Sequence, residues 1–303
     1  MKRVLIGGGS GFIGTRLSNH LKNCGYGVTI ISRKPQLNHI SWIEIEKNGL
    51  REPFNAVVNL CGQNVLDPTR RWSPGFKLNV WNSRINSSKT LVKAISEAKS
   101  EIRPEVFINI SGVSNYKPDD KKVYTENDNL ESYDYMSELC NAWEKAATID
   151  KLTTGCRNVK LRTGVVLGRE GGMIASLFVP FFMGFGGPVG DGNQPLPWIH
   201  VEDLCELIRF SIENKNVEGV LNAVAPQIIK NKDFAQAFGR ALWRPAFIPL
   251  PSQAVEFMFS KERAVLLTTG AKIKPLRTLE TGFQYQYPTI NEALKDCAKL
   301  FMF

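Results

Sequence analysis

The sequence lacks the side-chain clusters that indicate a metal site or a disulfide framework. Its 303 residues contain six cysteines and three histidines, with no C-x-x-C pair and no short Cys/His spacing. Zinc sites and disulfide-rich folds need such spacings, so we expect neither, and no metal is assigned. Six reduced thiols are typical of an intracellular protein. We expect a cytoplasmic location, with an organelle such as the mitochondrial matrix left open.

Positive charge is not concentrated in one block either. The chain carries 38 Lys and Arg against 29 Asp and Glu, a net charge of +9. The basic residues occur in scattered pairs such as Arg33-Lys34 and Arg70-Arg71. Nucleic-acid-binding proteins usually gather this charge on one face or arm. We therefore expect no nucleic-acid partner, and an anionic small molecule explains the diffuse excess equally well.

We expect neither a membrane-spanning segment nor a signal peptide. The stretch from Met173 to Gly190 carries no charge, but two prolines and four glycines interrupt it. So broken a run is a poor membrane span and is better interpreted as a helix followed by a loop over a pocket. An apolar strand starts by residue 3, so we expect no signal peptide. A soluble protein with no membrane partner is the expectation.

Strands and helices alternate over the first half of the chain. Strands are predicted at residues 3–7, 28–31, 56–60, 106–110 and 159–167. Stretches with helical spacing of apolar residues separate them, and the first of these begins at Phe12. This alternation predicts an α/β Rossmann-type fold, a doubly wound parallel sheet with helices on both faces. Such a sheet binds ligands at the carboxyl ends of its strands.

The regular alternation weakens near residue 170. We expect a dinucleotide-binding Rossmann domain over residues 1–170, rejoined by about 200–225, and a substrate region with a smaller, mainly helical C-terminal domain over 171–303. Helices are predicted at 202–212, 233–242, 253–259 and 263–267, and a strand at 220–224. No repeat or low-complexity linker separates the two parts, so the second region should pack against the first.

A glycine-rich loop follows the first strand and opens the first helix. Residues 7–14 read GGGSGFIG, which satisfies G-x-G-x-x-G from Gly9 and G-x-x-G-x-x-G from Gly8. Small residues let the chain turn tightly and let a pyrophosphate approach the helix N-terminus. A turn without a ligand is the alternative. We predict a dinucleotide site whose contacts are Gly8, Gly9, Ser10, Gly11, Phe12 and Ile13.

The end of the second strand predicts which cofactor binds. An acidic residue about twenty positions after the loop would bind the adenosine ribose of NAD. Ser32-Arg33-Lys34 stands there instead. A hydroxyl and a guanidinium can hold a 2′-phosphate by charge-assisted hydrogen bonds. We therefore predict NADP(H) with Ser32 and Arg33 as contacts, and an exposed polar turn is the alternative.

Further motifs follow the glycine loop in a fixed order. They are NLCG at 59–62, RRW at 70–72, Trp143-Glu144, RTGVVLG at 162–168 and PWIHVED at 197–203. This series resembles the atypical extended short-chain dehydrogenase/reductases called epimerase-family proteins, which carry a C-terminal domain of unknown function. The resemblance covers essentially the whole chain, including PLP at 249–251 and TGF at 281–283. It is greatest to animal members regarded as NADP-dependent oxidoreductases.

The resemblance implies further cofactor contacts. Leu60 and Cys61 would line the adenine-ribose side, with plain core packing as the alternative for Leu60. Asn79 and Arg84 would approach the cofactor from across the expected cleft, unless Arg84 is a surface cation. Arg162 would face the nicotinamide half or its phosphates. The resemblance also leaves a homodimer open.

The catalytic pattern of that family is absent. Its members use Ser, Tyr and Lys, with Tyr-x-x-x-Lys on one helix, where the Lys charge lowers the pKa of the Tyr and Lys holds the ribose. None of the seven tyrosines here has a lysine four positions later. Alignment on Glu144 puts Met136 at the tyrosine position and Cys140 at the lysine position. The serine position falls on Gly112, beside Ser111.

Only weak candidates for a replacement proton donor remain. Tyr116 would reach a substrate carbonyl or simply pack in the core, and His200 would be a general acid or a core histidine. Cys140 would be a replacement acid or, on an apolar helix face, an inert buried thiol. The full set near the expected cleft is Ser111, Tyr116, Glu126, Tyr133 and His200.

Two functions stay open at this point. The first is an NADP(H)-dependent oxidoreductase or epimerase-like protein that acts on an unidentified small molecule with a non-standard proton donor. The second is a catalytically inactive module whose NADPH occupancy regulates a partner. The chemistry of the family favours the first, and the missing Tyr and Lys favour the second. We prefer the oxidoreductase by a small margin.

Overall fold

A seven-stranded parallel sheet forms the centre of the protein, for which a computed structural model describes residues 1–36, 39–67, 69–119 and 121–299. The strand order is β10-β7-β5-β4-β1-β2-β3. Their bounds are β1 Arg3–Gly7, β2 Gly27–Ser32, β3 His39–Ser41, β4 Ala56–Asn59, β5 Val106–Gly112, β7 Arg157–Thr163 and β10 Gly219–Ala223. The order reverses between β1 and β4, as in doubly wound folds. The predicted Rossmann-type α/β class is confirmed.

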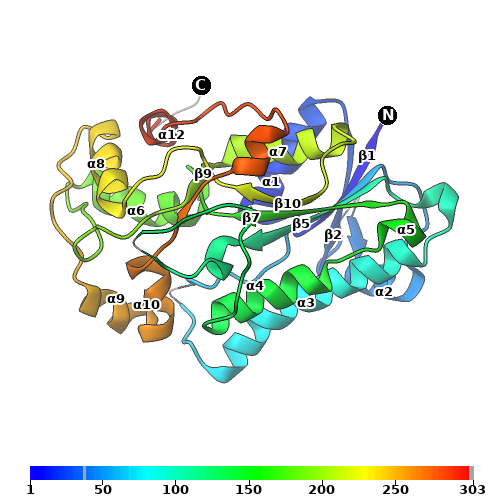
Figure 1. The fold of residues 1–303 in the computed structure, drawn as a ribbon, viewed down its shortest axis with the longest axis horizontal. Helices are drawn as coiled ribbons and strands as arrows, with labels where there is room; N and C mark the ends of the chain where they lie inside the picture. Colours follow the sequence, from blue (N-terminus) through cyan, green and yellow to red (C-terminus); the bar gives the residue numbers. More distant parts are fainter. Residues whose placement is uncertain (37–38, 68, 120, 300–303) are drawn as a thin grey trace.

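Helices cover both faces of this sheet (Figure 1). On one face lie α1 (Phe12–Asn23) and α7 (Val201–Glu213), which pack against each other. On the other lie α2 (Trp42–Asn48), α3 (Pro74–Ser96), α4 (Tyr135–Ala146) and α5 (Lys151–Thr154). Short 3-10 turns occur at Ser100–Ile102 and Val113–Asn115. The predicted helices beginning near residues 12, 76 and 202 are therefore present.

Alternate residues of the strands build the two cores. Val4 and Ile6 of β1 belong to the core under α1 and α7, whereas Leu5 belongs to the core under α3. This two-residue period follows from the strand backbone, which points successive side chains to opposite faces. All three side chains are fully buried. Because β1 packs into both cores, its carboxyl end and the glycine loop that follows are fixed between the two helical layers.

The strand predicted at residues 159–167 is two strands in the structure. β7 ends at Thr163, and β8 (Val165–Gly168) pairs with β9 (Trp198–His200) in a separate parallel sheet. Gly164 lies at the break, where a Cβ would be 2.7 Å from the carbonyl oxygen of Pro197. The backbones approach so closely there that only glycine fits, and the chain exchanges one partner strand for another.

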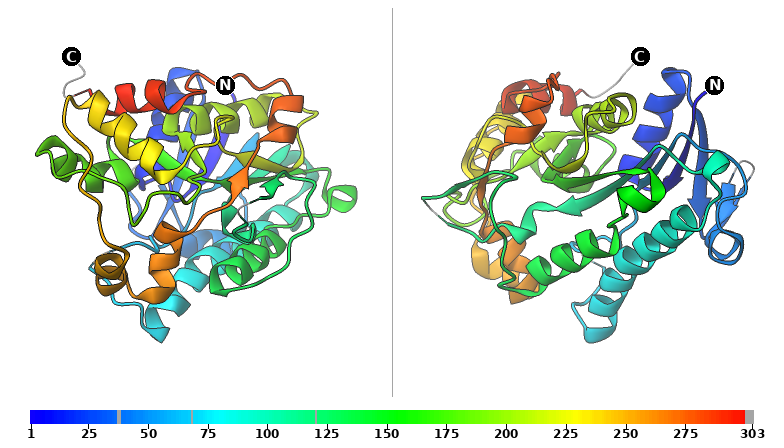
Figure 2. Two further views of the ribbon diagram at one scale, coloured as in Figure 1. Left: turned by 60° about the vertical axis from the view of Figure 1, so that its left-hand side comes forward. Right: turned by 45° about the vertical axis from the view of Figure 1, so that its right-hand side comes forward.

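The remaining elements form a mainly helical part at one end of the sheet (Figure 2). They are β6 Val123–Tyr124, α6 Gly172–Phe182, α8 Asn231–Ala241, α9 Ser252–Phe259, α10 Lys261–Thr268, β11 Lys272–Ile273, α11 Leu276–Glu280 and α12 Ile290–Cys297. Phe178 and Phe181 of α6 pack against Phe238 of α8 in a core of their own. Across the described ranges, no helix is both long and apolar enough to cross a membrane.

Candidate functional site

The glycine loop packs tightly against the end of β4. Gly8 has φ +78°, and a Cβ there would lie 2.8 Å from the carbonyl carbon of Leu60. A Cβ at Gly14 would lie 2.3 Å from the carbonyl oxygen of Gly8. Both glycines are therefore required by the packing of the loop itself. They hold the N-terminus of α1 at the carboxyl ends of β1 and β4.

Gly11 differs from these two because its missing side chain faces open space. A Cβ on Gly11 would meet only the Gly8 carbonyl oxygen, at an ordinary 3.5 Å. Gly11 is the N-cap of α1; no side chain caps this end, and the first turn has no acidic residue. The first N–H groups of a helix have no intrahelical acceptor and carry partial positive charge. A pyrophosphate would fit this place in both shape and charge.

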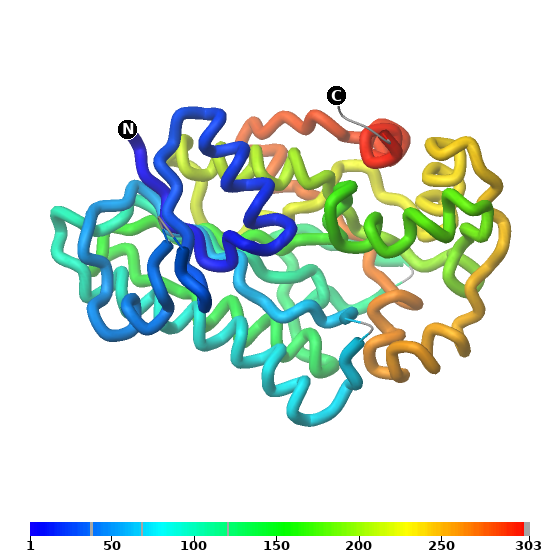
Figure 3. The backbone as a smooth tube through the Cα atoms, turned by 180° about the vertical axis from the view of Figure 1, so that it is seen from behind, coloured from blue at the N-terminus to red at the C-terminus, as the bar shows by residue number. Residues whose placement is uncertain are grey.

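Two further predicted contacts follow the loop into α1. Phe12 packs under the start of α6, where a Cβ on Gly171 would lie 2.4 Å from the Phe12 ring. Seen from behind, the start of α1 and α6 lie next to each other (Figure 3). Ile13 packs against the main core, and Ser10 is exposed at the tip of the loop. In this loop a ligand can reach the uncapped start of α1 and the Ser10 side chain.

The predicted phosphate-binding residues lie at the end of β2. Ser32 hydrogen-bonds to the backbone of Lys34, its hydroxyl accepting from the N–H at 3.1 Å. Arg33 is exposed. Burial raises the pKa of the Cys61 thiol to about 12, and the nearby charge of Arg33 lowers it by a smaller amount. A Cβ on Gly7 would lie 3.3 Å from the Cys61 sulfur. The ends of β1, β2 and β4 thus bring these residues together.

Arg84 reaches the same edge from α3. Its Nη1 donates to the carbonyl oxygens of Gln63 at 3.0 Å and Val80 at 3.1 Å, and its guanidinium lies 5.0 Å from the Trp143 ring centroid. Burial is the main cause that lowers its pKa, and no carboxylate pairs with it in the described residues. It is therefore not a plain surface cation. Asn79 lies exposed on the same helix.

Arg162 has a partner that sequence reasoning did not assign. Its Nε and Nη2 donate to the two carboxylate oxygens of Glu144 at 2.8 and 2.9 Å, and both side chains are buried. Nη1 donates to the Tyr116 hydroxyl at 3.0 Å. This forked pair neutralises the guanidinium within the protein. The resemblance implied that Arg162 faces the nicotinamide half or its phosphates. In the structure, Glu144 already compensates the charge of Arg162.

The hydroxyl candidates are bonded into the same buried network. Ser111 donates to Glu144 at 2.8 Å, and Tyr116, only 1% exposed, donates to the Asn222 side-chain oxygen at 2.8 Å. Tyr133 donates to the carbonyl of Ser114 at 2.8 Å. Each of these protons already has an acceptor. A substrate would have to displace one of these bonds to receive a proton.

The carboxylate candidate Glu126 is held in this network as well. It accepts from the backbone N–H of Asn222 at 2.9 Å and of Arg277 at 3.2 Å. These contacts join β10 to α11 and leave the Glu126 side chain buried. Sequence motifs gave no signal for Asn222 or Arg277, because their partners, Glu126 and Tyr116 among them, are distant in the chain.

Two of the three positions aligned with the family's triad lie side by side. A Cβ on Gly112 would lie 3.3 Å from the Cys140 sulfur, so the serine and lysine positions are adjacent. Cys140 is buried, and burial raises the pKa of its thiol to about 12. Met136 packs in an apolar cluster with Trp72 and Leu266. Gly112, Met136 and the buried Cys140 thiol therefore bring no group that ionises near neutral pH.

His200, the other weak candidate, lies in a different layer. It is the N-cap of α7, and its Nδ1 accepts from the Glu202 N–H at 3.3 Å. Its ring contacts the Tyr287 ring in a tilted arrangement with centroids 3.9 Å apart. A pocket of about 140 Å³ between α1, α7 and α12 contains it. Because α4 lies on the opposite face of the sheet, the structure does not bring His200 to Ser111 or Tyr116.

Comparison with known proteins agrees with this geometry. The NAD dependent epimerase/dehydratase family matches residues 4–223, and a domain of unknown function (DUF1731) matches residues 250–297. The chain belongs to the epimerase/dehydratase family. The epimerase family protein SDR39U1 of Bos taurus is 44% identical over 295 residues, which cover 97% of this chain and 99% of that protein. The predicted resemblance is confirmed.

Solved structures agree with the epimerase/dehydratase assignment. Human SDR39U1, crystallised with NADPH, superposes with a TM-score of 0.95 at 43% identity, covering 99% of this chain and 100% of that one. Its cofactor is the one predicted here from Ser32 and Arg33. A UDP-N-acetylglucosamine 4-epimerase from Bacillus cereus superposes with a TM-score of 0.77 at 17% identity and 98% coverage of each chain. That likeness concerns the fold alone.

Proposed function

We propose that the protein is an NADPH-binding module that has lost the proton relay of its family. The observation that carries this proposal is the set Gly112, Met136 and Cys140, which fills the triad positions without an ionisable group at working pH. A proton donor must have a pKa near the working pH and lie within reach of the reacting atom. Gly112 and Met136 have no proton to give, and the buried Cys140 thiol stays protonated.

Nucleotide binding is supported by the donor set at the sheet edge. The uncapped start of α1 and the open space at Gly11 suit a pyrophosphate. Ser32 and the exposed Arg33 would bind a 2′-phosphate, and Arg84 would approach from α3. NADPH is also the cofactor present in the human relative's structure. When bound, NADPH would supply a hydride; the chain's own residues would orient and retain it.

Calorimetry and a turnover assay test the two halves of this proposal separately. We expect the unmodified protein to bind NADPH at least about tenfold more tightly than NADH. We also expect NADPH absorbance to remain constant when a panel of carbonyl compounds is added. Equal affinity for both cofactors would overturn the assignment of Arg33. Consumption of NADPH with any carbonyl compound would overturn the inactive module.

An oxidoreductase is the second candidate, and Arg84 favours it. Its guanidinium acts on the Cys140 thiol, so a cation stays near the lysine position. Such a cation could hold a ribose hydroxyl or stabilise a developing negative charge. Under this alternative some carbonyl substrate is turned over, and Arg84→Met slows that turnover more than Arg84→Lys does. An active protein indifferent to both changes would contradict the alternative.

A further inference from the structure

Exposed apolar side chains gather on two segments of the helical C-terminal part. The end of α6 and its following loop expose Val179, Phe182, Met183 and Phe185, and the segment after α8 exposes Trp243, Phe247, Ile248 and Leu250. We call these eight residues the apolar patch. Figure 1 shows α6 and α8 at the end of the molecule opposite α2 and α5.

Backbone contacts hold the two segments of the apolar patch together. The N–H groups of Ile248 and Leu250 donate to the carbonyl oxygens of Gly186 and Pro188 at 3.1 and 2.8 Å. A Cβ on Gly187 would lie 1.8 Å from the Ile248 carbonyl oxygen, so the approach requires glycine. The two segments that carry the patch are therefore held side by side.

Two aromatic residues of the patch are exposed over most of their surface. Trp243 is 90% exposed and Phe247 75% exposed. Trp243 also has φ +56°, a left-handed conformation that is uncommon for a bulky residue. Exposed aromatic side chains cost free energy in water, and contiguous apolar patches mark interaction sites. A tryptophan exposed to this extent points to a use for that side chain.

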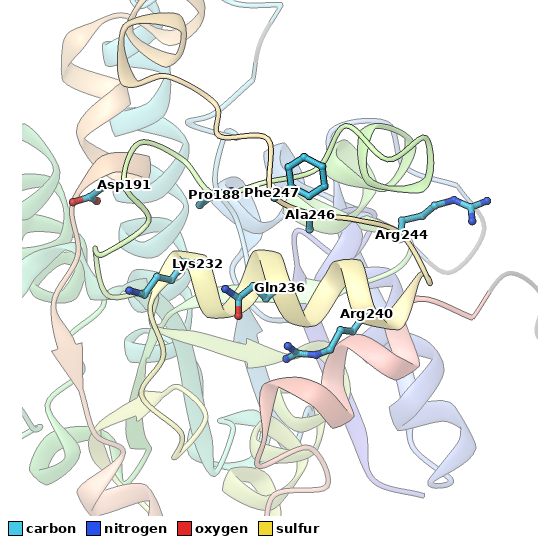
Figure 4. Close-up of a pocket in the computed structure, with 8 residues that line it drawn as sticks. All are labelled: Pro188, Asp191, Lys232, Gln236, Arg240, Arg244, Ala246 and Phe247. Atoms are coloured by element: carbon cyan, nitrogen blue, oxygen red, sulfur yellow. The ribbon is translucent and has the colours of Figure 1, made fainter.

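A basic hollow adjoins the patch. It has a volume of about 450 Å³, and Lys232, Arg240, Arg244 and Phe247 line it, together with Asp191 (Figure 4). The three cations bind only neutral acceptors: Asn193, Asn291 and the carbonyl oxygens of Phe182 and Trp243. No carboxylate lies within ion-pair distance of any of them in the described part of the chain. Two positive charges therefore remain after Asp191 is counted.

We propose that this surface docks on membranes that contain anionic phospholipids. The hollow would receive a headgroup phosphate, and Trp243 and Phe247 would enter the interface beside it. Tryptophan prefers the membrane–water boundary, and basic side chains next to it are attracted to anionic lipids. Side chains that protrude from loops suit a lipid surface better than a protein groove. This inference does not rest on nucleotide binding, and it departs from the expectation of no membrane partner.

Vesicle sedimentation tests the proposal with the full chain. We expect the protein to sediment with vesicles of phosphatidylcholine and phosphatidylserine, and at least about tenfold less with phosphatidylcholine alone. Arg240→Glu with Arg244→Glu should reduce binding to the anionic vesicles by about tenfold or more, because each basic residue contributes to the attraction. Trp243→Ser with Phe247→Ser should reduce it as well. High salt should release the unmodified protein.

Matched controls come from the other end of the molecule. Leu152 on α5 is 97% exposed but isolated, so Leu152→Ser should leave vesicle binding unchanged. Lys47→Glu with Arg51→Glu makes the same charge change on exposed residues outside the patch and should lower binding little. Circular dichroism and NADPH affinity verify that each variant folds. Should a paired variant unfold, the single variants Arg244→Glu and Trp243→Ser should still each reduce sedimentation with anionic vesicles.

Three outcomes would overturn the proposal. The first is no sedimentation with anionic vesicles. The second is binding that the paired variants reduce no more than their controls. The third is a different occupant: a dimer in sedimentation velocity that Trp243→Ser dissociates, or capture of a polyglutamate peptide, with no vesicle binding in either case.

Discussion

The glycine loop before α1 and the helix α4 both lie at the carboxyl ends of the sheet strands. The loop keeps the residues that its family uses, whereas α4 lacks them. In the loop, Gly8 and Gly14 are fixed by packing and Gly11 leaves room for a ligand. In α4, Met136 and Cys140 occupy the tyrosine and lysine positions. Under the proposed function, nucleotide binding and proton transfer are carried by separate elements, and the second is lost while the first is retained.

Among the changes considered, loss of the buried ion pair between Arg162 and Glu144 should lower the stability of the fold most. Glu144→Ala leaves Arg162 buried without its counter-ion, and we expect a loss of about 3–5 kcal/mol in the free energy of unfolding. Arg3 and Glu52 form a partly exposed pair at 2.7 Å, so Glu52→Ala serves as control and should cost about 1 kcal/mol or less. Denaturant unfolding measures both, and equal costs would contradict the structural role of the buried pair.

Two glycine substitutions separate packing from ligand space within the loop. Gly14→Val places a side chain where backbone already lies, and we expect about 3 kcal/mol of destabilisation. Gly11→Val enters open space, so the fold should survive while NADPH affinity falls at least about tenfold. Thermal unfolding with and without NADPH measures both effects. Normal NADPH affinity in Gly11→Val would show that the loop is only a turn.

The sequence predicted the glycine loop and the main elements because their signals are local. The apolar period of β1 and the glycines before Phe12 are readable in a short window. The break at Gly164 was not predicted, since it depends on Pro197, thirty-three residues away in the chain. Runs of apolar residues cannot show where a strand changes partners.

The candidate site was predicted unevenly for the same reason. The loop, Arg33 and Cys61 come together as strand ends must in a parallel sheet. The pairing of Arg162 with Glu144 and the separation of His200 from α4 depend on long-range packing. The motifs RTGVVLG and PWIHVED contain Arg162 and His200 but do not show which residues these two contact.

Acid should destabilise the protein through His200 at the start of α7. Burial lowers the pKa of His200 to about 4, below its unfolded value near 6.5. The unfolded chain therefore binds more protons between these values, and stability decreases as pH falls through this window, by up to about 3 kcal/mol. Asp203, whose pKa burial raises to about 6, acts in the opposite direction, so variants must be compared.

His200→Asn isolates this contribution, because asparagine can still cap α7 but does not titrate. Unfolding experiments from pH 7 to pH 4 should show a smaller acid-side loss in the variant than in the unmodified protein. NADPH affinity should not change. Parallel pH profiles for the two proteins would contradict the buried neutral state of His200.

The preference for NADPH over NADH tests the role of Arg33 at the end of β2. Arg33→Asp should reverse the order of NADPH and NADH, because the carboxylate repels a 2′-phosphate and accepts from a ribose hydroxyl. The expected change is at least tenfold, or about 1.4 kcal/mol, by titration calorimetry. Lys47→Asp, an exposed charge reversal on α2, is the control. A preference that survives Arg33→Asp would assign the phosphate to another residue.

Restoring the family's residues should have the smallest effect. Gly112→Ser, Met136→Tyr and Cys140→Lys together recreate the spacing, with the last two side chains one helical turn apart. The gain in turnover should be small, since a buried ammonium is costly unless a ribose receives it. NADPH consumption with the carbonyl panel measures it. A large gain would mean that these three residues alone were missing.

The central claim is that the protein holds NADPH without using it. The most direct test follows the absorbance of NADPH bound to the unmodified protein in the presence of carbonyl compounds, against free NADPH as reference. We predict that bound NADPH is oxidised no faster than free NADPH with every compound. Faster oxidation with any one of them would contradict the claim and identify a substrate of an active oxidoreductase.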